Sequence, residues 1–175
     1  MLNTVVIALV ILVGAILIYA ATRPDSFRIE RSITIQSTPE KIFSLINNFH
    51  QWESWSPWEK IDPQINRTYS GAPEAKGAIY EWSGNKNIGQ GRMEIVESVP
   101  STKITIKLDF ITPFEAHNAV DFVLKPQGTS TLVTQAMYGQ RPFIHKLMGL
   151  FFNMEKMVGE KYEEGLANLK RMAET

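Results

Sequence analysis

Few side chains in this 175-residue sequence could carry out chemistry. The absence of cysteine excludes a thiolate nucleophile, a thiolate metal site and disulfide bonds. The three histidines, His50, His117 and His145, form no metal-type pair, and neither an HExxH motif nor a G-x-S-x-G elbow is present. A surface or capping position suits each histidine better than a ligating one. We therefore expect no metal ion and no cofactor.

Acid–base catalysis is left to three residues that we expect to face the interior, Tyr80, Gln135 and His145. Such catalysis needs a base or an oriented proton donor, and no carboxylate clearly accompanies these three. Gly89-Gln90-Gly91 lacks the third glycine and the following helix of a dinucleotide fingerprint, so it predicts a bend or bulge at the start of a strand. Catalysis is the less favoured interpretation.

The balance of charge also restricts the partners. Lysine and arginine number 18, as do aspartate and glutamate, so no overall field attracts nucleic acid. We expect no nucleic-acid role, and the length fits one domain or one domain with an appendage.

The first apolar run, residues 2–21, carries no charge and predicts a helix of about 30 Å, the thickness of bilayer hydrocarbon. A cleaved signal peptide is the alternative, but no Lys or Arg precedes the run, which favours an uncleaved anchor. Arg23, Arg28 and Arg31 follow it, so the positive-inside rule places the remainder in the cytoplasm. We predict a single-pass anchor at 1–22, a linker at 23–26 and one domain at 27–175.

The domain opens with an alternating strand from Phe27 and then a helix, announced by Thr38-Pro39-Glu40. Three of the four tryptophans follow within seven residues, Trp52 to Trp58, where they either plug one end of a core or line a binding cavity. Clear turn signals then separate the further strands. We predict these strands at 77–83, 90–99, 103–111, 117–125 and 130–138, with a short one at 65–70.

The last segment, Pro142 to Met172, has apolar residues at helical spacing for about eight turns. Its first half is apolar on most sides, so we expect the strands to enclose it. The fold class is α+β: a curved antiparallel sheet of about six to seven strands around a long C-terminal helix, preceded by one transmembrane helix.

This order of elements resembles the helix-grip fold of the START-like superfamily, also called SRPBCC, and within it the bacterial polyketide cyclase/dehydrase-related branch. The resemblance covers roughly residues 27–173. The segments that carry it are Glu30-Arg31-Ser32-Ile33, Thr38-Pro39-Glu40-Lys41-Ile42-Phe43, Trp52-Glu53-Ser54-Trp55-Ser56-Pro57-Trp58, Gly89-Gln90-Gly91 and Gly165-Leu166-Ala167-Asn168-Leu169-Lys170. It is specific for the fold and weak for activity, because the scaffold serves carriers, sensors and cyclases.

The resemblance implies a deep apolar cavity between the sheet and the terminal helix, although the same side chains could instead pack together and leave no space. Alternation places one set of residues on the inner face, and the helix supplies flexible methionines opposite. Gln135 needs a partner there, which a ligand or a backbone group could supply. The predicted ligand-binding residues are Trp55, Trp58, Tyr80, Trp82, Met93, Leu108, Phe110, Phe122, Gln135, Met137, Phe143, Met148, Phe151 and Phe152.

The sequence thus predicts a membrane-anchored domain that binds a hydrophobic small molecule, such as a lipid or isoprenoid. Phe143, Phe151 and Phe152 would gate the mouth of its cavity. One alternative is a polyketide cyclase/dehydrase-like enzyme on the same scaffold, for which no catalytic residue can be assigned. The other is a membrane-tethered protein-interaction module with a filled cavity.

Overall fold

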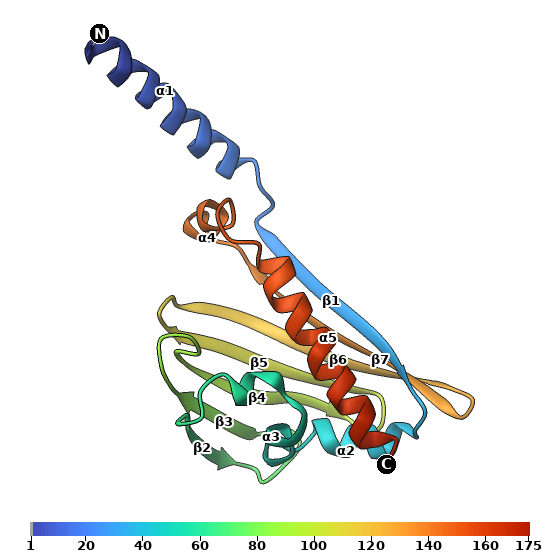
Figure 1. The fold of residues 1–175 in the computed structure, drawn as a ribbon. Coiled ribbons are helices and arrows are strands. Elements are labelled where there is room, and N and C mark those ends of the chain that lie inside the picture. Colours follow the sequence, from blue (N-terminus) through green and yellow to red (C-terminus); the bar gives the residue numbers. More distant parts are fainter. Residues whose placement is uncertain (1) are drawn as a thin grey trace.

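The computed structural model describes residues 2–175. Helix α1 (Leu2–Ala21) projects away from the rest of the chain, and a short linker joins it to the first strand (Figure 1). Asn3–Ala21 is long and apolar enough to cross a membrane, a test that a signal sequence near an N-terminus also passes. Most side chains of α1 are exposed, as expected for a helix that is not part of the core.

Seven antiparallel strands form one sheet in the order β1-β7-β6-β5-β4-β3-β2, so the first strand pairs with the last. The alternation of apolar and polar residues gives the sheet one buried and one wet face. The predicted meander is confirmed, with ends within about two residues of those expected. The strands are β1 (Ser26–Ile35), β2 (Asn66–Gly71), β3 (Ala78–Ser83), β4 (Gln90–Val99), β5 (Lys103–Thr112), β6 (Ala116–Gln127) and β7 (Ser130–Gln140).

Short helices fill the connection between β1 and β2. The predicted helix start is confirmed, because the Thr38 hydroxyl accepts a hydrogen bond from the Lys41 N–H and Pro39 occupies the first turn. The tryptophan segment forms one helical turn that ends before Pro57. These elements are α2 (Pro39–Ile46), η1 (Phe49–Gln51), α3 (Trp52–Trp55) and η2 (Pro57–Lys60).

The predicted continuous helix from Pro142 to Met172 is wrong: the segment forms two helices, α4 (Phe143–Met148) and α5 (Met154–Ala173). Gly149 ends α4, where its N–H donates to the His145 carbonyl. The Asn153 side chain then caps α5 by accepting from the Lys156 N–H at 3.0 Å. Glycine is a poor helix former and asparagine a strong N-cap, so the break has a local cause.

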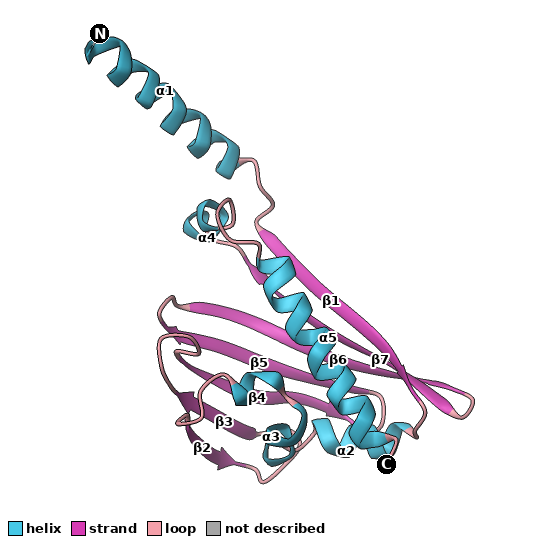
Figure 2. Cartoon of the chain, viewed as in Figure 1, coloured by secondary structure: helices cyan, strands magenta, loops and turns pink. Residues whose placement is uncertain are grey.

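Helix α5 lies diagonally across the buried face of the sheet, with α2 and α3 beside its C-terminal end (Figure 2). Arg31, the one charged residue on the apolar side of β1, fixes this arrangement. Its guanidinium pairs with Glu163 at 2.5 Å and with Glu155 at 2.9 Å, one turn to either side of Gly159. A Cβ on residue 159 would overlap that guanidinium, so glycine allows the side chain to cross the helix.

The expectation that the sheet encloses the first half of the C-terminal segment is also wrong. Six apolar side chains of α4, of the break and of the first turn of α5 remain exposed, because α4 contacts α1 instead of entering the sheet. The exposed residues are Phe143, Ile144, Phe151, Phe152, Met154 and Met157.

Candidate ligand-binding site

The inner face of the sheet carries the side chains that the sequence assigned to it. Its predicted members on β3 to β7 are buried, except Phe110, which is half-buried. The register confirms their common side, since Tyr80 lies opposite Met93, Met93 opposite Leu108, and Phe122 opposite Gln135. The strands therefore present one continuous, mostly apolar surface to α5.

One end of this surface is completely filled. Phe122 has no exposed area, and the rings of Trp52 and Trp55 pack edge-on against it with centroids 5.9 and 6.1 Å away. The indole N–H groups of both tryptophans donate to backbone carbonyls of α2. Trp55 thus packs as part of a plug, one of the two roles that the sequence left open for it. Trp58 is only half-buried, in η2.

The other end, beneath α4, is less well covered. Along β5, Ile104 and Ile106 are fully buried, whereas Leu108 retains 7% of its surface. Met93, opposite Leu108 in the sheet, retains 8%, and Phe110, further along β5, is half-buried. Methionines of α5 border this end too, and they are exposed. The interior of the domain is thus filled towards α2, while its border towards α4 includes the half-buried Phe110 and exposed methionines of α5.

Gln135 lies on β7, opposite Phe122 and so beside the filled end. Among residues 2–175, its Oε1 is the buried side-chain atom that lacks a hydrogen-bond partner. Tyr162 of α5 lies close to it; burial raises the pKa of Tyr162, and contact with the Gln135 amide lowers it in part. A buried acceptor without a donor costs about 1–3 kcal/mol, so this oxygen can accept from a hydroxyl or N–H group that enters the interior.

Two hollows in the described part of the chain lie outside the space between the sheet and α5. One holds about 120 Å³ and is lined by Phe49, His50, Tyr69 and the β2–β3 turn. The second, about 400 Å³, is open to solvent and lies where β1 begins and β7 ends, around Phe27 and Tyr138. Because neither hollow lies there, the candidate site is defined by position alone, as the end of the apolar interior beneath α4.

Tyr80 has a carboxylate partner that the sequence analysis missed. Its hydroxyl donates to Glu59 at 2.7 Å, and the other oxygen of Glu59 accepts from Arg67 Nε at 2.7 Å. Burial, and then the hydrogen bond to Glu59, raises the pKa of Tyr80, so the phenol stays protonated. Because all three groups are satisfied by one another and Tyr80 is only 3% exposed, the cluster holds η2 against the sheet.

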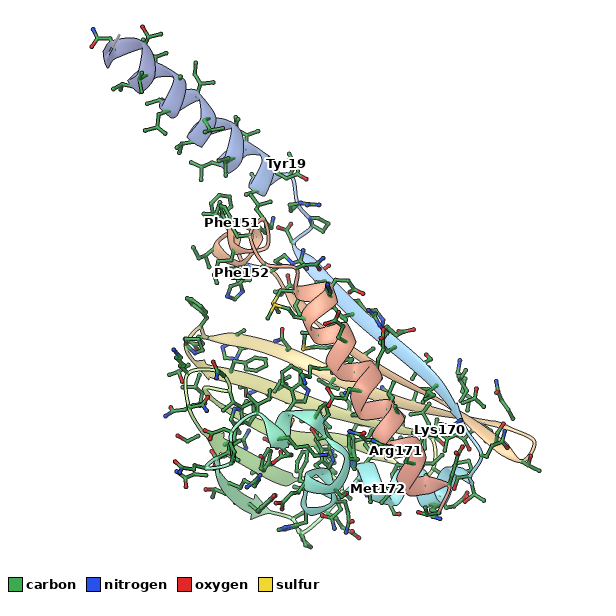
Figure 3. The ribbon with its side chains drawn as sticks, in the orientation of Figure 1. Tyr19, Phe151, Phe152, Lys170, Arg171 and Met172 are labelled. Carbon is green, nitrogen blue, oxygen red and sulfur yellow. The ribbon has the colours of Figure 1, made fainter. Side chains whose placement is uncertain are left out.

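The helix-side candidates lie apart from the sheet residues. Phe143, Phe151 and Phe152 are exposed on α4 and the break after it, and Met148 is half-buried. Figure 3 places Phe151 and Phe152 near Tyr19, at the end of the domain opposite Met172. The expected surface position of His117 is confirmed: it lies on the wet face, 2.7 Å from Asp109, which raises the pKa of His117. His50 stacks on Tyr69, and His145 is half-buried on α4.

The sheet order, the grip of the sheet on α5 and the apolar inner face define a helix-grip domain. Residues 26–174 match the family described as polyketide cyclase / dehydrase and lipid transport, and the chain belongs to this family. Among curated proteins, none matches the chain.

Solved structures show the same fold. Protein CV1439 from Chromobacterium violaceum has a TM-score of 0.61 at 13% identity, over 87% of this chain and 99% of that one. Protein MLL2253 from Mesorhizobium loti has a TM-score of 0.62 at 16% identity, over 83% and 96%. StfQ, a di-domain ARO/CYC from the steffimycin biosynthetic pathway, has a TM-score of 0.62 at 10% identity. The match covers 85% of this chain and 51% of StfQ. These likenesses concern the fold and not the activity.

Proposed function

We propose that this protein binds a hydrophobic small molecule, lipid- or isoprenoid-like, through the α4 end of its helix-grip domain, while α1 anchors the domain to the cytoplasmic side of a membrane. The observation that carries this proposal is the unequal closure of the interior. The same inner face that is filled by Trp55 and Phe122 at one end carries the half-buried Phe110 towards the other, where Met154 and Met157 of α5 are exposed. Binding sites for apolar ligands are concave, apolar and equipped with few polar groups, as this end is.

The chemistry of the lining agrees with a guest that is mostly apolar. Met93 and Met137 lie on the buried inner face of the sheet, and Met154 and Met157 are exposed at the start of α5; methionine adapts its shape to irregular ligands. Gln135 adds one hydrogen-bond acceptor at the depth where the filled region begins. A long aliphatic chain with a single hydroxyl or amide donor satisfies both features.

The location of the open end supports a membrane source for the ligand. Helix α4 contacts α1, and the linker between α1 and β1 is held to α4 by the ion pair of Lys146 with Asp25. The Arg141 N–H also donates to the Asp25 carbonyl at 2.6 Å. An anchor in this position keeps the open end beside the bilayer, into which hydrophobic molecules partition.

The test uses the domain from Arg23 to Thr175, which retains Asp25. After purification without detergent, native mass spectrometry should show a lipid-sized adduct, and fatty acids or sterols should raise the melting temperature. At a hundredfold excess of ligand over Kd, the added stability is about 2.7 kcal/mol. An adduct-free spectrum together with unchanged melting in every ligand would contradict the proposal.

The enzymatic alternative rests on the family and not on a constellation of catalytic groups. Tyr80 and Glu59 are adjacent, yet they are buried and hydrogen-bonded to each other. If the protein were a cyclase that uses Tyr80, Tyr80→Phe would abolish turnover of a polyketide substrate while the fold remained intact. We expect instead that this substitution changes stability and leaves ligand binding in place.

A further inference from the structure

Besides α1, the described chain has a second exposed apolar surface. Outside α1, ten large apolar side chains are exposed, and six of them lie within residues 143–157. We call these six, Phe143, Ile144, Phe151, Phe152, Met154 and Met157, the interfacial patch. Phe151, the most exposed, retains 73% of its surface. Soluble surfaces carry such residues singly, whereas a cluster marks a contact surface.

The place of this patch is fixed by the contact between α4 and α1. Ala20, in the last turn of α1, is fully buried, and Lys146 of α4 is buried in its ion pair with Asp25. Figure 3 shows Phe151 and Phe152 beside the end of α1 that carries Tyr19. Tyrosine at the end of a membrane span is typical of the headgroup region. The patch therefore lies at the depth of the membrane surface whenever α1 spans the bilayer.

The charges around the patch favour lipid over a protein partner. Arg23 and Arg141 have no ion pair among residues 2–175, and each guanidinium lies over an aromatic ring, Tyr19 at 4.9 Å and Phe27 at 5.4 Å. The carboxylates beside the patch are paired, Glu155 with Arg31 at 2.9 Å and Glu160 with Lys156 at 3.8 Å. Aromatic and aliphatic side chains beside unpaired cations are typical of segments that lie in a membrane interface, where anionic headgroups neutralise the cations.

We propose that the interfacial patch is inserted into the same leaflet that α1 enters, so that the domain is held at two points with its open end facing the acyl chains. This inference rests on the proposed anchoring by α1. It adds an orientation that a flexible tether alone would not impose: the apolar interior meets lipid directly, and a ligand enters without crossing water.

The absence of cysteine makes a depth measurement direct, because each single-cysteine variant takes one spin label. Full-length protein in vesicles of phosphatidylcholine and phosphatidylglycerol (three to one) would be labelled at Phe151→Cys or Met154→Cys. Val99→Cys is the matched control, since Val99 is also apolar and 41% exposed but lies at the end of β4. Val10→Cys reports whether α1 itself is inserted.

Collision rates with oxygen, which concentrates in lipid, and with a nickel chelate, which stays in water, give the result. We expect the collision rate with oxygen to exceed that with the nickel chelate at residues 10, 151 and 154, and the reverse at residue 99. The labels at residues 151 and 154 should lie at a depth of about 5–10 Å. Nickel access at 151 and 154 with a protected residue 10 would overturn the patch proposal and leave the anchor. Nickel access at residue 10 would overturn the anchor and the patch together.

A third outcome is a low collision rate with both reagents at residue 151, together with spin–spin broadening that disappears when unlabelled protein is added. This result would show contact between copies of the chain and would overturn the proposal. Phe152→Cys gives a second reading if the Phe151 variant misfolds, and circular dichroism identifies a misfolded variant.

Discussion

Phe122→Ala measures how tightly the closed end of the domain is packed. Phe122 has no exposed area and contacts two tryptophan rings edge-on. Truncation of a core phenylalanine costs about 3–5 kcal/mol, which includes the cavity left behind. Loss of two edge-on ring contacts, each worth about 0.5–1.5 kcal/mol, places this site in the upper half of the range. For a domain of this size, the melting temperature should fall by roughly 6–20 °C.

Phe110→Ala is the matched control on the same inner face. Phe110 is half-buried at the open end and has one edge-on contact, with Trp82 at 5.9 Å, so its loss should cost about 1–2 kcal/mol. Urea unfolding of the domain from Arg23 onward, followed by tryptophan fluorescence and circular dichroism, gives both free energies. Equal losses at the two positions would refute the inference that one end is sealed and the other open.

Three further predictions follow from individual contacts. Tyr80→Phe should lower the free energy of unfolding by about 1.5–3 kcal/mol, because Glu59 loses a buried hydrogen-bond donor. Equilibrium denaturation measures this change, and an unchanged free energy would show that water replaces the hydroxyl. Gly159→Val should lower the melting temperature more than Gly159→Ala, since the larger side chain displaces the Arg31 guanidinium further; equal effects would argue against that contact. The pKa of His117 is raised, so its pairing with Asp109 stabilises the fold fully below the ordinary value of about 6.5, and this stabilisation is lost as pH rises through the folded value. His117→Gln should therefore flatten the stability profile above about pH 6.5, and an NMR titration midpoint at or below the ordinary value would contradict this.

The strands could be predicted because their signal is local. Alternation over ten residues sets the face of each side chain, and the turns between strands contain the glycine and proline that they require. The bend expected at Gly89-Gln90-Gly91 is confirmed, since the pairing of β4 with β5 shifts register between Gln90 and Gly91 and Gly89 has a φ of +64°. Gly91 is also required there, because a Cβ would overlap the ring of Trp82.

The misses depend on contacts between distant segments or on competition between local signals. Helical spacing continues past Gly149, so the periodicity concealed the break that glycine and the Asn153 cap produce. Glu59 could not be assigned to Tyr80 because the two residues are 21 positions apart and meet only in the folded chain. Arg31 interrupts the apolar pattern of its strand because it pairs with two glutamates of α5, which lie more than a hundred residues later in the sequence.

The central claim is that a hydrophobic ligand enters at the α4 end, and methionine methyl NMR tests it most directly. In the domain labelled with 13C-methyl methionine, a titration with oleate should shift the signals of Met93, Met137, Met154 and Met157. Met172, near the opposite end of α5, should stay in place (Figure 3). Unchanged signals at all five positions, or shifts as large at Met172 as at Met93, would contradict the claim.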